Sequence, residues 1–246
     1  MLNLHINLIF SSQVRAFIIG YFVLHFYFME QRKLLERELN LLRDRLLLMG
    51  GEVELALQRA MHALVQRNSE AANQVLEHDR VIDQLELEID RLCVEVLTLR
   101  RPVARELRVV ISIFKITPVL ERIADHATSI ARAALELNDE PELKIYGGLT
   151  EMSDRALEML QSALDAFTTN DSDRARTLIK EDEEVDKIYD RLVNDLMKTM
   201  SQDAAKSTRL ARILFVAKNL ERIGDYVKDI CELTVYMKEA VFIKHQ

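Results

Sequence analysis

Apolar residues recur every three or four positions along most of the chain, and this spacing predicts long amphipathic helices. Between Gln31 and Arg67, for example, leucine, methionine, valine and alanine repeat at helical intervals. No segment shows sustained alternation of apolar and polar residues bounded by turns, so no sheet is predicted. The pattern therefore favours an all-α fold.

Short polar segments and glycine or proline residues divide this pattern into six helices. The expected ranges are 31–67, 70–99, 102–137, 149–169, 173–200 and 204–237. Gly50-Gly51 is expected to interrupt the first helix and to bend it. Pro102 is expected to open the third helix at its first turn. The linker 138–148 separates two tandem three-helix bundles, 29–140 and 149–240.

Residues 1–28 differ from the rest of the chain. They hold seven of its fifteen aromatic residues and a single formal charge, Arg15. The apolar run 16–28 is too short to span a bilayer unaided, and no small-residue cleavage site follows it, so a secretory signal peptide fits poorly. Two interpretations stay open, a membrane-lying anchor or extraneous sequence before a true start at Met29, and we favour the second.

Composition narrows the class of protein. Six glycines and three prolines among 246 residues, with 30% charged residues, are typical of long helices. The formal net charge of −7 and the lack of a basic stripe argue against nucleic-acid binding. Cys93 and Cys231 each fall on an apolar stripe, which predicts buried free thiols in a reducing compartment.

One five-residue motif occurs twice, 100 residues apart: Glu121-Arg122-Ile123-Ala124-Asp125 returns as Glu221-Arg222-Ile223-Gly224-Asp225. Each copy places two carboxylates four residues apart, on one side of a helix. A second carboxylate pair precedes each copy, Asp79/Asp83 in the first repeat and Asp182/Asp186 in the second. The chain has thus duplicated a cluster of four acids.

The four acids of each repeat are expected to meet. The two pairs lie on consecutive helices joined by a short turn, and such helices pack antiparallel. In both repeats the pairs are nearly equidistant from that turn, so they should lie level with each other. Asp79 and Asp182 also occupy places in apolar stripes, which indicates that they lean toward the neighbouring helix.

Clustered carboxylates need neutralisation, because two unit charges 4 Å apart repel by about 4 kcal/mol at an effective dielectric near 20. Magnesium, manganese, calcium or iron would suit an all-oxygen site. Neutralisation by Arg122 and Arg222 is the alternative that needs no metal. Any single pair would fit a solvated helix face, but the repetition and the level placement favour metal.

Three neighbouring residues are weaker candidates for metal ligands. Glu86 lies in the apolar stripe and is a possible extra ligand of the first site, whereas Tyr189 takes its place in the second. His78 and His126 lie beside the acid pairs and are interpreted as polar side chains at the rim, with metal ligation as the minor alternative.

Nothing in the sequence favours an enzyme. The Glu-x-x-His element of ferritin-like di-iron proteins is absent, as are a glycine-rich phosphate loop, a G-x-S-x-G elbow and zinc-type Cys/His spacing. No nucleophile–base pair can be argued, so no catalytic residue is predicted.

Through these motifs, the chain resembles the PhoU family of phosphate-transport regulators over about residues 30–240. The resemblance rests on Met49-Gly50-Gly51, the two Asp-x-x-x-Asp pairs, Arg101-Pro102-Val103-Ala104 with Leu107-Arg108, and both copies of the five-residue motif. Two copies in the right order make it highly specific.

The resemblance implies a cytoplasmic, usually dimeric protein built from two three-helix bundles. It implies multinuclear clusters of iron, zinc, manganese or magnesium bound through the acidic motif. It also implies negative regulation of phosphate-starvation signalling, as an adaptor between the ATPase of the phosphate ABC transporter and a membrane sensor histidine kinase. Carried over by position, the metal ligands are Asp79, Asp83, Glu121 and Asp125, and then Asp182, Asp186, Glu221 and Asp225.

Two features depart from the family. Pro118 lies three residues before Glu121, where the family continues its helix, and a kink there would alter the first site. Lys218 holds the corresponding place in the second repeat. The aromatic leader is the other departure. A structural adaptor without metal and a di-metal carboxylate enzyme, such as a hydrolase or oxidase, are the rival hypotheses.

Overall fold

The computed structural model describes residues 12–143 and 146–243. Within these ranges the chain is helical and contains no strand, which confirms the predicted all-α fold. The elements are α2 (Ser12–Val65), α3 (Ser69–Arg100), α4 (Ala104–Asn138), α5 (Gly147–Thr169), α6 (Ser172–Gln202), the short 3-10 helix η2 (Ala204–Lys206) and α7 (Ser207–Glu239).

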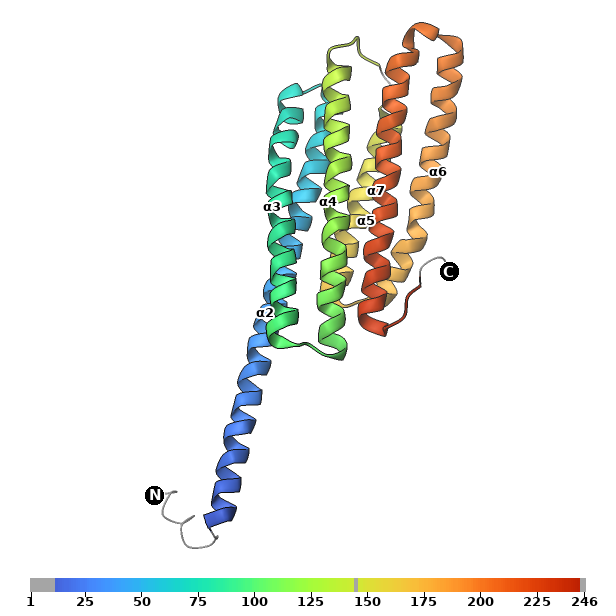
Figure 1. The fold of residues 1–246 in the computed structure, drawn as a ribbon. Helices are drawn as coiled ribbons and strands as arrows, with labels where there is room; N and C mark the ends of the chain where they lie inside the picture. Colours follow the sequence, from blue (N-terminus) through green and yellow to red (C-terminus); the bar gives the residue numbers. More distant parts are fainter. Residues whose placement is uncertain (1–11, 144–145, 244–246) are drawn as a thin grey trace.

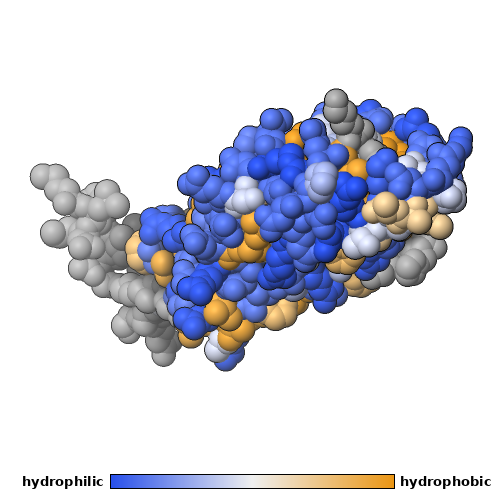
Figure 2. All heavy atoms as spheres, turned by 90° about the horizontal axis from the view of Figure 1, so that it is seen from above, coloured by the Kyte–Doolittle hydropathy of each residue, from blue (hydrophilic) through white to orange (hydrophobic). Residues whose placement is uncertain are grey.

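The helices form two repeat-related units, α2–α4 and α5–α7, that lie side by side (Figure 1). Helices α4 and α7, which carry the two copies of the five-residue motif, pack against each other, and α2 also contacts α5. From above, most of the visible surface is hydrophilic, with smaller apolar areas between (Figure 2).

Side-chain caps fix the helix starts that the sequence indicates. The Asn68 side chain accepts a hydrogen bond from the Ala71 amide at 3.1 Å. Asp171 accepts from the amides of Asp173 and Arg174 at 3.1 and 3.0 Å. These bonds satisfy amide groups that have no partner within the first helical turn.

The start of α4 differs from the prediction. Arg101 is in the left-handed region at φ 48°, and Val103 is extended at φ −126° and ψ 156°. The extended residue lies between Pro102 and the helix, so α4 begins at Ala104 and Pro102 belongs to the turn.

The predicted interruption at Gly50-Gly51 is wrong, because α2 is one helix from Ser12 to Val65. No described glycine has a positive φ. A Cβ atom at Gly50 would lie 2.5 Å from Cδ1 of Leu164 in α5, whereas one at Gly51 would meet nothing within 4 Å. Gly50 therefore makes room for the Leu164 side chain of α5 beside α2.

Helix α4 also continues through Pro118. The ring removes one backbone donor, and the carbonyl four residues earlier belongs to Phe114. Phe114 lies on the exposed side of the helix, with 42% of its surface accessible. The segment that carries Glu121 and Asp125 is helical on both sides of the proline.

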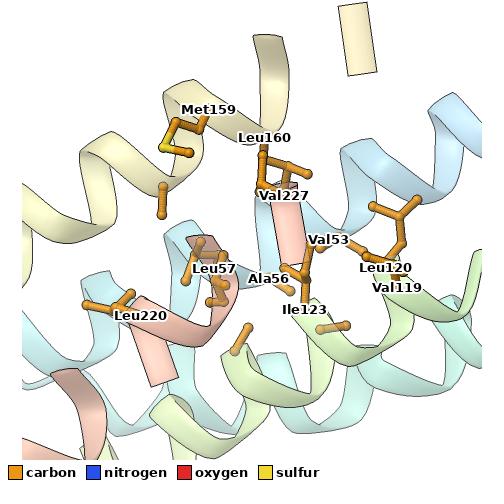
Figure 3. Close-up of a cluster of buried hydrophobic side chains, with 14 of the residues drawn as sticks. Val53, Ala56, Leu57, Val119, Leu120, Ile123, Met159, Leu160, Leu220 and Val227 are labelled. Carbon is orange, nitrogen blue, oxygen red and sulfur yellow. The ribbon is translucent and has the colours of Figure 1, made fainter. Parts of the chain in front are cut away.

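A single hydrophobic core extends across both units. Figure 3 shows buried side chains of four helices meeting: Val53, Ala56 and Leu57 of α2, Val119, Leu120 and Ile123 of α4, Met159 and Leu160 of α5, and Leu220 and Val227 of α7. Cys93 and Cys231 are buried free thiols, as predicted. Burial raises the pKa of each thiol to about 12, which keeps both protonated at neutral pH.

The first part of α2 projects beyond the bundle (Figure 1). Tyr21, Phe22 and Phe26 lie on this projection and are largely exposed. Residues 1–11 of the aromatic leader lie outside the described part of the chain. Among the helices that the structure describes, none combines the length and the apolar character needed to cross a membrane.

Candidate functional site

The first repeat brings its four predicted acids together between α3 and α4. Burial, then the charge of Asp125, raises the pKa of Glu121 to about 7, with further contributions from Glu86 and Asp83 and a hydrogen bond to Asp125. Burial raises the pKa of Asp79, and the charges of Asp83 and Asp125 add to it. The four carboxylates thus lie within electrostatic range of one another, and we call them, with Glu86, the first carboxylate cluster.

Glu86 belongs to this cluster by its surroundings. Burial raises its pKa first, and the charges of Asp90, Asp83 and Asp125 raise it further. At Asp79 the positive charge of Arg132 in α4 opposes the upward shift, because it lowers the pKa of that acid. The first cluster therefore carries five carboxylates and little compensating positive charge.

The second repeat brings Asp182, Asp186, Glu221 and Asp225 together between α6 and α7, and these form the second carboxylate cluster. Burial raises the pKa of Asp186, and the charges of Glu221 and Asp225 act in the same direction. Asp182 is buried, with only 3% of its surface accessible. Burial raises the pKa of Asp182, although Lys228 opposes the shift.

Lys228 supplies the second cluster with its own cation. Its Nζ atom lies 2.6 Å from Oδ2 of Asp182 and 2.8 Å from Oδ1 of Asp225. Burial disfavours the charge on Lys228, but hydrogen bonds to these two carboxylates outweigh it and raise the pKa of the lysine. Thr128 holds the equivalent position in the first repeat and donates its hydroxyl to the Asp125 carbonyl at 2.9 Å. The two clusters therefore differ in charge.

Gly224 makes room for the buried acid of the second cluster. A Cβ atom at this position would lie 2.5 Å from Oδ1 of Asp182. That oxygen is buried and has no hydrogen-bond partner among the described residues. The first repeat has Ala124 instead, and its corresponding acid, Asp79, is only half-buried.

The arginines of the two motifs are used differently. Arg222 reaches Oδ2 of Asp225 with Nη1 at 3.2 Å, which agrees with the metal-free alternative for one acid. Arg122 forms no ion pair with any described residue, and its guanidinium carbon lies 5.9 Å from the centre of the Tyr226 ring.

The two histidines beside the acid pairs each contact another polar side chain. The Nε2 atom of His78 is 2.6 Å from Oε2 of Glu52. The Nδ1 atom of His126 is 2.7 Å from Oδ1 of Asn219. Because one ring nitrogen of each histidine is engaged in this way, the carboxylate oxygens are the main atoms of the clusters that could bind a metal.

These donors suit a cation by their chemistry, although no group of three or more Asp, Glu, His or Cys in the described chain is already arranged to hold a metal ion. Carboxylate oxygens are the preferred donors of hard cations. Burial raises the pKa values in the first cluster, and mutual repulsion among the carboxylates raises them further; a bound cation would relieve that repulsion. The first cluster therefore fits the predicted metal better than the second, where Lys228 already lies between two acids.

Comparisons with known proteins agree with this architecture. The family model described as PhoU domain matches residues 46–134 and 149–234. A phosphate-specific transport system accessory protein PhoU homolog of Clostridium acetobutylicum is 35% identical over 207 residues, which cover 84% of this chain and 94% of the relative. The corresponding protein of Escherichia coli K12 is 35% identical over 208 residues, covering 85% and 86%.

Two solved structures share the fold. The crystal structure of PhoU from Pseudomonas aeruginosa superposes with a TM-score of 0.81 at 38% identity, covering 84% of this chain and 99% of that one. The phosphate transport system regulatory protein PhoU from Streptococcus pneumoniae gives a TM-score of 0.79 at 29% identity, covering 85% and 99%.

Proposed function

This chain belongs to the PhoU family, and from that premise we propose that it is a negative regulator of phosphate uptake and phosphate-starvation signalling. Its relatives are named accessory and regulatory proteins of the phosphate-specific transport system. The chain is accordingly an accessory protein of that system and not an enzyme. The finer role is that of an adaptor between the transporter ATPase and a sensor histidine kinase.

One observation supports a role that depends on metal: the acids that the two repeats share come together from two different helices. Asp79 and Asp83 come from α3, whereas Glu121 and Asp125 come from α4. A divalent or trivalent cation held by these four, with Glu86 beside them, would neutralise them and link the two helices. The surface that a partner contacts would then depend on the bound ion.

The second cluster has less need of a metal. Lys228 neutralises Asp182 and Asp225, so a metal there must compete with a cation that is part of the chain. We therefore assign the stronger metal requirement to the first cluster. Asp182, Asp186, Glu221 and Asp225 remain the ligand set of the second.

Recovery of partners tests the adaptor role. The full chain, immobilised as bait in lysate from phosphate-replete cells, is expected to retain the phosphate transporter ATPase or a sensor histidine kinase. An unrelated helical bundle of similar charge serves as the control bait. Retention of neither partner, or equal retention on the control, would count against the adaptor.

Metal analysis of protein purified without added metals tests the ligand sets. Asp79→Asn/Asp125→Asn is expected to remove most of the bound metal, and Asp182→Asn/Asp225→Asn to remove less. Asp154→Asn changes an exposed acid of α5 and serves as the matched control. Unchanged metal content in both double variants would leave the structural adaptor without metal as the better account.

A further inference from the structure

A hollow lined by basic side chains lies where α4 meets α7, beside the carboxylate clusters. This groove has a volume of about 480 Å³. Arg122 and Arg132 of α4 and Lys218 and Arg222 of α7 line it, against one carboxylate, Asp125. The chain as a whole has a net charge of −7. Four cations against one carboxylate give the lining of this hollow a positive charge balance, which favours an anionic ligand.

Two pairs of equivalent positions from the two repeats line the groove. Arg122 and Arg222 are equivalent, and their guanidinium carbons lie 5.9 and 5.3 Å from the centre of the Tyr226 ring. His126 and Tyr226 are equivalent as well, and their rings are 5.5 Å apart. The aromatic face stabilises nearby guanidinium groups in part and leaves their hydrogen-bond donors available.

The cations of the groove are unequally neutralised. Lys218 pairs with Glu221 at 2.6 Å, and Arg222 reaches Asp225 at 3.2 Å. Arg132 acts electrostatically on Asp79. Arg122 forms no ion pair within the described ranges. Arg122 is therefore the cation with most to gain from a ligand.

A hydrogen-bonded chain holds one wall of the groove in place. The Asn219 amide nitrogen donates to the Phe215 carbonyl at 2.7 Å, so its oxygen is the atom that faces His126. That oxygen can only accept, and Nδ1 of His126 must therefore carry the hydrogen of their 2.7 Å contact. Asn219 is 5% exposed, so the side chain that joins Phe215 to His126 is buried.

We infer that the groove binds a small phosphorylated anion, with Arg122 and Arg222 as its paired anchors. Planar guanidinium groups match phosphate oxygens in a bidentate manner. The volume falls within the range of roughly 300–1,000 Å³ that is typical of small-molecule sites. It admits inorganic phosphate and also larger molecules that carry the same phosphoryl group. A ligand there would contact both repeats, and it needs no metal.

Calorimetric titration of the metal-free full chain, at constant ionic strength set with chloride, tests the site. Inorganic phosphate and pyrophosphate are the probes. Saturable binding of one or both is expected, and Arg122→Gln should weaken it by about tenfold, since it removes a charge-assisted contact. Arg191→Gln removes the same charge from a side chain of α6 that is 70% exposed, and it should bind as the unmodified chain does.

The two probes separate the possible ligands. Tighter binding of phosphate indicates a site for the free ion, and tighter binding of pyrophosphate indicates a larger phosphorylated molecule. Arg122→Lys keeps the charge but loses the planar donor pair, so it should fall between the other variants. Helix content by circular dichroism checks that each variant folds. Failure of both probes, equal affinity of Arg122→Gln and Arg191→Gln, or binding only after metal is added would overturn the inference. None of these results depends on the partner-recovery experiment.

Discussion

Lys228 reaches two carboxylates of the second cluster with one ammonium group, whereas its counterpart in the first repeat is the neutral Thr128. A buried acid such as Asp182 is costly unless a positive charge compensates it. The lysine supplies that charge permanently at the second cluster, whereas the neutral Thr128 supplies none at the first. This one difference between the repeats therefore leaves two similar sets of acids with different amounts of compensating positive charge.

The Lys228→Gln variant tests this difference at the second cluster. Without the ammonium group, buried Asp182 loses the ion pair with Lys228, and Arg222 still pairs with Asp225. The metal-free protein should therefore lose about 2 kcal/mol of unfolding free energy. Added manganese or magnesium should restore stability more in this variant than in the unmodified chain, because the competing cation is gone. Thermal unfolding with and without metal measures both effects.

Lys187→Gln is the matched control for that variant, because Lys187 is 64% exposed and, among the described residues, forms an ion pair with Glu184 alone. Its expected effect is within about 0.5 kcal/mol. Equal stability of Lys228→Gln and Lys187→Gln would show that Lys228 does not hold the second cluster together.

Glu121 gives the first cluster a predictable pH dependence when no metal is bound. Its folded pKa is raised to about 7 from an ordinary value of 4.5. Between these values the folded protein binds more protons than the unfolded chain, so stability falls as the pH rises from 4.5 to 7. Glu121→Gln should remove that loss and raise the melting temperature at pH 8. The gain should stay below about 1 kcal/mol, since solvent screens a partly buried group.

Glu221→Gln is the control for this measurement, because Glu221 pairs with Lys218 at 2.6 Å. Its removal deletes an attraction and should not stabilise the protein at pH 8. Melting curves of both variants between pH 5 and pH 8 make the comparison. A stabilised Glu221→Gln, or a Glu121→Gln that follows the unmodified protein at every pH, would contradict the assignment.

At the scale of single residues, the sequence predicts which acids come together better than it predicts which cation neutralises them. Spacing on each helix and distance from the turn suffice to bring Asp79, Asp83, Glu121 and Asp125 together. Lys228 escaped prediction although it lies three residues after Asp225 on the same face. Its role depends on how α7 is rotated toward α6, and an apolar stripe does not fix that rotation closely enough for one long side chain.

Helix α2 contains two adjacent residues that usually interrupt helices, and it continues through them. Two adjacent glycines suggest a break, yet the backbone at both is helical. The packing of α5 against α2 explains the glycine at position 50, because Leu164 occupies the space that a side chain there would need. Local sequence cannot reveal this, since the residue that demands the glycine lies more than 100 positions away. The caps at Asn68 and Asp171 act within a single helical turn, so short-range sequence is sufficient to define them.

The two glycines are a matched pair for a stability measurement on α2. Gly50→Ala places a methyl group 2.5 Å from Leu164 and should cost about 1–3 kcal/mol through overpacking. Gly51→Ala meets no neighbour and should stabilise the helix by about 0.5–1 kcal/mol. Urea unfolding of both variants measures the difference. Effects of the same sign would mean that helix propensity, and not the approach of α5, governs this region.

The two units are joined more closely than their sequences suggest. The linker 138–148 separates the repeats along the chain, but core side chains of α2, α4, α5 and α7 meet in one cluster (Figure 3). Arg108 of α4 also donates to the Met237 carbonyl of α7 at 3.2 Å. Apolar stripes identify which face of each helix is buried, and they leave open which unit covers it. The sequence therefore predicts two bundles and does not reveal their shared core.

A shared core should make the whole molecule unfold as one unit. Leu57 in the first repeat and Leu160 in the second are fully buried, and replacing either with alanine should cost about 2–5 kcal/mol. In urea, both Leu57→Ala and Leu160→Ala should lower the midpoint of a single transition, with far-ultraviolet circular dichroism and tyrosine fluorescence changing together. If the repeats were independent, two transitions would appear and each variant would move only its own. Cooperative unfolding would also mean that a ligand at the α4–α7 groove stabilises both repeats at once, since it binds where they meet.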